Sequence, residues 1–183
     1  MILPIYVYGS AILKKKASAV AEDYPDLQQL IADMKETLAN AEGVGLAAPQ
    51  VGHSIRLFIT DGAAFKNEDP NAASFQRVII NPEITAFSEE VCRFNEGCLS
   101  IPDIHEDVIR SRSITVRYLD ELFVTHEEHL SGIPARIVLH EFDHLEGVIF
   151  SEKLPAIRKK LIKGKLNNIA RGKTGAHYKT KII

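Results

Sequence analysis

Two stretches of the chain place apolar side chains at the spacing of an amphipathic α-helix. The first covers residues 25–41, with Asp23 as a candidate cap and Gly43 just beyond its end. The second opens at Pro155 and continues to about residue 170. Both are expected to turn one face to the core. Their apolar positions are Leu27, Leu30, Ile31, Met34 and Leu38 in the first, and Leu154, Ile157, Leu161, Ile162, Leu166 and Ile169 in the second.

Short apolar or alternating segments lie between these helices and predict β-strands. A stretch rich in Gly, Asn, Asp and Ala, residues 62–74, predicts a surface loop between two of them. The strands are expected at residues 56–60, 77–80, 91–99 and 109–118, with a shorter one at 148–150.

A third helix is predicted after Gly132, because Pro134 suits a first helical turn and Gly147 suits an end. A helix, several strands and then further helices favour an α+β fold over a doubly wound sheet. There is no internal repeat and no sign of a second domain. We therefore expect one domain over residues 1–170, followed by a tail, residues 171–183, whose lack of periodicity predicts no regular structure.

The composition is that of an ordinary globular protein, with 183 residues, 45% hydrophobic and 25% charged. No apolar run approaches the roughly 18–20 residues of a membrane span. The first residues lack the basic and long apolar regions of a signal peptide. Two cysteines are too few for a disulfide framework. These features predict a cytoplasmic protein with neither a membrane nor a DNA partner.

The charge is unevenly distributed, although its net value is only −2. Residues 153–183 hold 10 of the 22 Lys and Arg and none of the 24 Asp and Glu, so residues 1–152 hold 12 basic and 24 acidic side chains. A basic end on an acidic body is typical of contact with a polyanion such as RNA. The alternative interpretation is a solvated, partly disordered end.

The strongest chemical signal is the H-E-x-x-H sequence formed by residues 140–144. Positions i and i+4 lie on one face of a helix, so His140 and His144 can hold one metal ion. Glu141 stands beside them and can take a proton from a water at that metal. The pattern predicts metal-assisted hydrolysis.

A catalytic metal site usually has three protein ligands and one open position. The position that metzincin proteases use for the third ligand is Phe150 here, and no acidic residue follows Glu152. Only His177, in the tail, remains downstream. Cys98, in the segment Glu-Gly-Cys-Leu-Ser, is therefore the favoured ligand. A thiolate with two imidazoles suits Fe(II), Zn(II), Co(II) or Ni(II).

Other interpretations of these residues stay open at this point. Cys98 could be a core cysteine, as most lone cysteines are. Cys92 is the rival ligand, although a position in the core of a strand fits it better. His126 and His129 form an H-x-x-H pair in a hydrophilic segment, which favours an exposed surface position over a functional metal site.

Residues 43–52, Gly-Val-Gly-Leu-Ala-Ala-Pro-Gln-Val-Gly, are rich in small side chains. Glycine allows a ligand to approach the backbone closely, so an extended Gly45 could pair with a peptide as an added strand. The amide of Gln50 could stabilise an oxyanion. Taken alone, a tight helix-to-strand connection with a structural glutamine explains the segment as well.

Together, three blocks of this sequence resemble the peptide deformylase family. The family pattern contains G-x-G-x-A-A-x-Q, E-G-C-L-S and H-E-x-D-H. Here the blocks are residues 43–50, 96–100 and 140–144, all complete and in family order. The resemblance spans roughly residues 1–165. It implies antiparallel and mixed β-sheets around a central helix that carries H-E-x-D-H, plus a C-terminal helix.

The resemblance also implies a function, which is removal of the formyl group from the N-terminal formyl-methionine of newly synthesised polypeptides. It implies one divalent metal ion, natively Fe(II), for which Zn, Ni or Co can substitute. Docking of the basic C-terminal helix on the ribosome near the exit tunnel is a further hypothesis.

Residue by residue, the resemblance implies metal ligands, a general base, oxyanion donors and a substrate-binding set. The ligands are Cys98, His140 and His144, the base is Glu141, and the oxyanion donors are Gln50 and the Leu99 N–H. The substrate-binding residues are Val44, Gly45, Gly97, Ile133 and Ile137, with Arg110 in a supporting role.

Three positions depart from the common family pattern. His105 stands where many members have Arg, Leu139 precedes H-E-x-D-H where Gln is common, and Arg136 lies one turn before His140 with no predicted direction. The alternative function is that of an H-E-x-x-H metallopeptidase, which the missing downstream ligand disfavours. A metal-stabilised binding module would need a fourth protein ligand, and none is evident.

Overall fold

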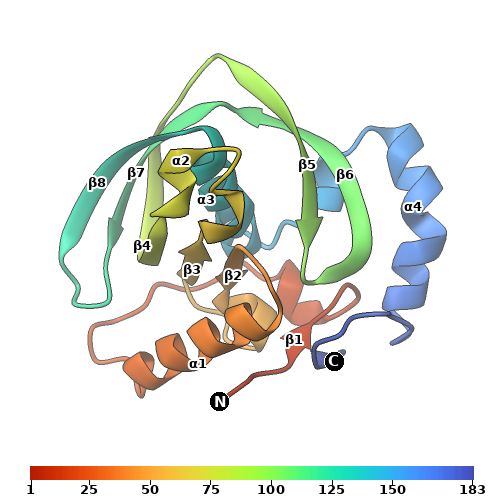
Figure 1. The fold of residues 1–183 in the computed structure, drawn as a ribbon. Coiled ribbons are helices and arrows are strands. Elements are labelled where there is room, and N and C mark those ends of the chain that lie inside the picture. The colour runs from red at the N-terminus through yellow and green to blue at the C-terminus, as the bar shows by residue number, and fades with distance from the viewer.

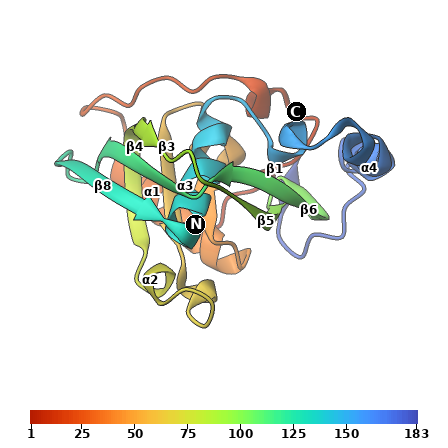
Figure 2. The same cartoon turned by 90° about the horizontal axis from the view of Figure 1, so that it is seen from above.

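The structure is a computed structural model and describes residues 1–183. It has three layers, and the middle layer is one central helix (Figures 1 and 2). The central helix α3, Gly132–Leu145, lies between a five-stranded sheet and a two-stranded hairpin. This arrangement confirms the expected α+β fold of sheets around the H-E-x-D-H helix.

The five-stranded sheet is antiparallel throughout, in the order β2-β3-β4-β7-β8. Its inner face packs on the apolar side of α3, where Phe58, Ile79, Val116 and Val138 are buried in one cluster. Its strands are β2 Gly45–Ala47, β3 Leu57–Asp61, β4 Gln76–Phe87, β7 Ser113–Leu119 and β8 Thr125–Ser131.

The antiparallel hairpin of β5, Val91–Cys98, and β6, Ile101–Ser111, closes the other side of α3. Helix α4, Ala156–Ile169, covers the outside of β6 (Figure 1). Helix α1, Leu27–Asn40, packs on the sheet through the apolar positions that its periodicity predicted, and all five of these are buried. Both outer helices agree with the sequence within two or three residues. No helix in this structure is long and apolar enough to cross a membrane.

Several predicted strands and loops differ from the structure. The single strand expected at 109–118 is the end of β6 followed by β7, because Arg112 leaves the ladder to bond Glu90 O. Strand β8 was not predicted, since Leu130 is its only buried residue and it has no apolar alternation to detect. The short strand expected at 148–150 is wrong, because the chain there enters the 3-10 helix η4, Phe150–Lys153.

The 62–74 loop contains two helical turns, η3 Ala63–Phe65 and α2 Pro70–Ala73. The remaining short elements are the 3-10 helices η1, Ala11–Lys14, and η2, Ala48–Val51. The tail, where we expected no regular structure, forms strand β9, Thr180–Lys181, which pairs in parallel with β1, Ile5–Tyr6. Both partners are two residues long, so their pairing leaves no periodicity in the sequence.

Candidate active site

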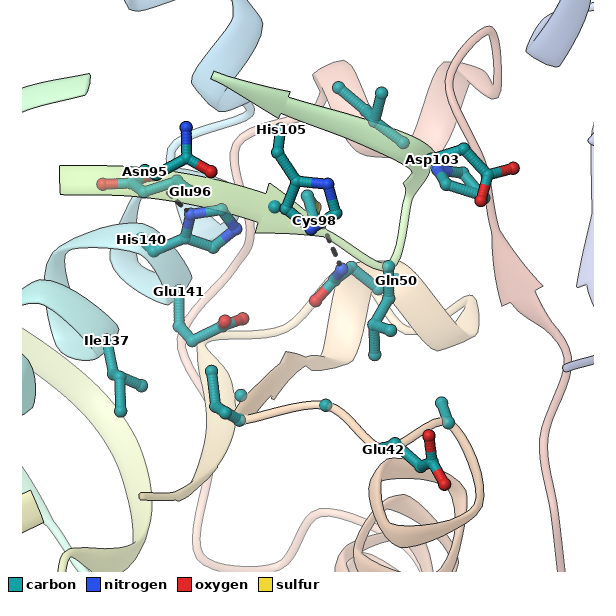
Figure 3. A pocket seen from close by; sticks show the side chains of 18 of the residues that line it. Glu42, Gln50, Asn95, Glu96, Cys98, Asp103, His105, Ile137, His140 and Glu141 are labelled. Atoms are coloured by element: carbon teal, nitrogen blue, oxygen red, sulfur yellow. Dashed lines mark hydrogen bonds and ion pairs between the residues drawn. The ribbon is translucent and has the colours of Figure 1, made fainter. Parts of the chain in front are cut away.

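A cavity of about 590 Å³ opens between α3, β5, the segment before β2, and the chain beyond α4. Cys98, Gln50, His140 and Glu141 converge on it from three different elements (Figure 3). The blocks that the sequence singled out therefore meet in one place, although they are about 50 residues apart along the chain.

The three residues expected to ligate a metal lie close enough together to share one ion. The ligating atoms of Cys98, His140 and His144 all lie within 4.8 Å of one another. Cys98 Sγ is 3.2 Å from His144 Nε2. One helical turn separates the imidazoles, whose ring centroids are 5.3 Å apart. Cys98 reaches them because β5 ends beside the helix, at the turn into β6.

The donor set and its surroundings fit a catalytic divalent metal. A thiolate and two imidazoles are three ligands suited to Fe(II), Zn(II) and related ions. His144 is buried behind the other two, whereas Cys98 and His140 line the cavity, so a fourth position faces the open space. Glu141 Oε2 is buried with no hydrogen-bond partner in the protein, as expected of a carboxylate that acts on a ligand in the site.

Glu96 orients one of these imidazoles. Its Oε2 lies 2.9 Å from His140 Nδ1, which leaves Nε2 to face the metal position. Arg110 donates to both oxygens of Glu96, at 2.7 and 2.9 Å, and to Asp143 at 2.6 Å. Burial alone would raise the pKa of Glu96, but the hydrogen bonds from His140 and Arg110 lower it well below its ordinary range. Glu96 is therefore a carboxylate at every physiological pH.

Arg136, whose direction the sequence left open, points inward and is 4% exposed. It donates to Glu96 Oε1 at 2.8 Å and to the Cys92 carbonyl at 2.7 Å, and its guanidinium lies over the Phe94 ring. Cys92 is thus a neighbour of this arginine, away from the two imidazoles. Sequence reasoning missed the role of Glu96 and Arg136, and the only available signal was the position of Glu96 within the E-G-C-L-S block.

Glu141 is 4% exposed, and burial raises its pKa to about 7. A carboxylate with a pKa near neutrality can both accept and return a proton at working pH. Gly45 lies directly against it, since a Cβ at Gly45 would be 2.4 Å from Glu141 Oε1. The small residue in the glycine-rich segment therefore makes room for this carboxylate, a reason that spacing alone could not reveal.

Gln50 and Leu99 also line the cavity, and Figure 3 shows the Gln50 amide pointing toward Cys98. Gln50 is 1% exposed; its Oε1 accepts from Ala47 N at 2.8 Å, which fixes the amide with its Nε2 toward Ser100 Oγ at 3.1 Å and Cys98 Sγ at 3.7 Å. The Leu99 N–H has no acceptor within the protein. Two N–H donors thus lie beside the Cys98 thiol.

The expected substrate-binding residues all line the cavity. Val44, Gly45, Gly97, Ile133 and Ile137 are among its walls. His105, the position that departs from the family pattern, pairs with Gly97 across the hairpin, where a Cβ on Gly97 would be 2.6 Å from the His105 ring. The cavity is also lined by residues 175–178, which sequence reasoning placed in a separate tail.

A Cys-His-His group that can hold one ion, with a carboxylate beside it at the wall of an open cavity, defines the class of metal-dependent hydrolases. The sequence model of the polypeptide deformylase family matches residues 2–160. The chain belongs to this family. Its enzymes remove N-formyl groups from nascent polypeptides.

Relatives and solved structures support this assignment over nearly the whole chain. A peptide deformylase of Christiangramia forsetii is 46% identical, with 99% of this chain and 96% of the relative covered. The crystal structure of a peptide deformylase from Legionella pneumophila has a TM-score of 0.82 at 36% identity, covering 93% of this chain and 96% of that one. A class I type b peptide deformylase from Acinetobacter baumannii, bound to Met-Ala-Ser, has a TM-score of 0.77 at 38% identity, covering 84% and 99%.

Proposed function

We propose that the chain hydrolyses the formyl group of N-formylmethionyl peptides, with Cys98, His140 and His144 holding the metal and Glu141 acting as general base and acid. The observation that carries this proposal is the meeting of these four residues on one cavity. When bound, the divalent metal supplies Lewis-acid polarisation and lowers the pKa of water.

The protein's own groups account for the proton transfers and for the charge that develops. Glu141 takes a proton from the attacking water, and its pKa of about 7 lets it return that proton to the leaving amine. Gln50 Nε2 and the Leu99 N–H donate to the formyl oxygen as negative charge grows on it. The products are formate and a free N-terminus.

The peptide is held by backbone and by apolar side chains. We assign the methionine side chain to the pocket formed by Val44, Ile133 and Ile137, with the backbone of Gly45 and Gly97 beside the peptide. The Acinetobacter baumannii structure bound to Met-Ala-Ser supports a peptide of this kind as ligand. The direct test is formate release from formyl-Met-Ala-Ser by anaerobically purified protein; no release by metal-loaded protein would refute the proposal.

Gln50→Ala should lower kcat for formyl-Met-Ala-Ser by about 100–1,000-fold, the usual cost of removing one oxyanion donor. Steady-state formate release measures this. Since Gln50 also contacts Ser100 and the Cys98 thiol, metal content has to be measured alongside. Near-normal turnover of the metal-loaded variant would contradict the assignment.

Gly45→Ala should reduce kcat by at least about 100-fold, because the new Cβ would displace the carboxyl group of Glu141, and a general base contributes about 10²–10⁴-fold. Gly164→Ala on α4 is the matched control, since a Cβ there meets nothing within 4 Å. Equal rates of formate release from the two variants would show that Glu141 does not need the space left by the missing side chain of Gly45.

We propose Fe(II) as the native metal and the cytoplasm as the compartment. A thiolate on a redox-active ion makes oxidation in air a natural route of inactivation. Protein prepared with Fe(II) should therefore lose activity in air, whereas Ni(II)-loaded protein should keep it. Equal stability of the two in air would count against Fe(II).

We also propose that helix α4 docks on ribosomal RNA near the nascent chain. Arg158 is engaged with Glu106 at 2.8 Å, but the other basic side chains of the helix are exposed and none of them forms an ion pair. Ribosome binding should weaken steeply with salt, since neutralising phosphates releases counterions. Salt-insensitive binding, or none, would contradict this. The four exposed lysines are Lys159, Lys160, Lys163 and Lys165.

A further inference from the structure

The chain beyond α4 returns to the mouth of the active-site cavity. Strand β9 pairs with β1, and the backbone N–H of Ile5 donates to Lys179 O at 2.8 Å. At the end of the chain, the N–H of Ala11 donates to Ile183 O at 3.1 Å. These bonds anchor residues 175–178 along the cavity, on the side where Leu99 lies.

Tyr178 connects this segment to the residue that carries an oxyanion donor. Its hydroxyl donates to the Leu99 carbonyl at 2.7 Å. The two side chains pack on the same apolar cluster. Burial, together with the charges of the nearby Cys98 and Asp103, raises the pKa of Tyr178, so the hydroxyl keeps its proton and remains a donor.

The turn that contains Leu99 is held from several directions. Ser100 O accepts from Tyr8 N at 2.8 Å, and Ser100 Oγ accepts from Gln50 Nε2 at 3.1 Å. Cys98 pairs with Ile101 across the turn. The carbonyl of Leu99 itself has one hydrogen-bond partner, the Tyr178 hydroxyl. This hydrogen bond is therefore the direct restraint on the orientation of the Leu99–Ser100 peptide unit, which comes directly after the Leu99 N–H.

We propose that Tyr178 is a positioning residue for the reaction, which holds the Leu99 turn so that the Leu99 N–H points at the developing oxyanion. The inference rests on the proposed role of Leu99. It makes the C-terminal segment part of the active site, although the match to the family model ends at residue 160. Tyr178 does not touch the reacting atoms; it acts through the Leu99 backbone.

Tyr178→Phe removes the hydroxyl and keeps the ring in the apolar cluster. We expect kcat for formyl-Met-Ala-Ser to fall about 3–10-fold, the range for one hydrogen bond of ordinary strength. KM and the affinity for the product Met-Ala-Ser should stay within about twofold, because the lost restraint matters mainly where charge develops. Tyr24→Phe is the matched control, since its hydroxyl bonds His53 at 3.3 Å outside the cavity.

A fall in kcat confined to Tyr178→Phe, with product affinity, metal content and Tm close to wild type, supports the inference. An unchanged kcat would overturn it. A fall in kcat accompanied by weaker product binding and a lower Tm would also overturn it, because it would show a general loss of structure. Wild-type protein without deformylase activity would instead refute the proposed function, so the two failures are distinguishable.

Discussion

Glu141→Gln should lower kcat on formyl-Met-Ala-Ser by about 10²–10⁴-fold, the contribution usual for a general acid or base. Glutamine has nearly the same shape but cannot accept the proton of the attacking water. Since Glu141 is not among the residues whose ligating atoms cluster, the variant should keep its metal. Metal analysis and steady-state formate release on the same preparation measure both quantities.

Glu89→Gln is the control for this substitution. Glu89 is exposed between β4 and β5 and takes part in no ion pair, so its variant should match the wild type in kcat. Turnover of Glu141→Gln at more than about a tenth of the wild-type rate would remove Glu141 from the role of general base.

Cys98→Ala should lose both metal and activity. Only two imidazoles remain to hold the metal. Removing a residue that hydrogen-bonds to a ligand typically lowers metal affinity by about 10–100-fold, and removing a ligand itself should cost more. We therefore expect the metal affinity of Cys98→Ala to fall by at least about 100-fold. Formate release should fall below detection at metal concentrations that saturate the wild type. Metal titration of the anaerobically purified apoprotein measures the affinity.

Cys92→Ala provides a test with the other cysteine. Cys92 Sγ lies 3.1 Å from Arg136 Nη2 and is not part of the ligating group, so this variant should retain metal. A modest loss of stability is expected, because Arg136 loses one buried contact. If Cys92→Ala lost the metal and Cys98→Ala kept it, the ligand assignment would be reversed.

The helices and strands show which parts of the fold local sequence patterns can predict. Helices α1 and α4 were predicted within a few residues, because burial of one face leaves a helical period in the sequence, although Ile157 and Leu161 of α4 are exposed rather than turned to the core. Strand β8 was missed because six of its seven residues carry no buried apolar signal to alternate, and it is held by its ladder with β7. Strand β9 depends on pairing with residues 175 positions away, which no local pattern records.

The sequence by itself determined the chemistry of this protein. His140 and His144 must share a helix face because of their spacing, and three complete blocks in family order indicated the reaction and Cys98 as the candidate third ligand. Only the tertiary structure decided what surrounds those groups. Gly45 leaves space for the Glu141 side chain, and Glu96 orients the imidazole ring of His140.

The same division holds at the edge of the site, where Arg136 faces inward and Tyr178 reaches Leu99 across 79 positions of the chain. The physical reason is the range of the interactions. Helical periodicity and motif spacing are short-range and can be read along the chain. Hydrogen bonds to a buried carboxylate or to a distant carbonyl depend on how the sheets, the hairpin and the C-terminal segment pack around α3.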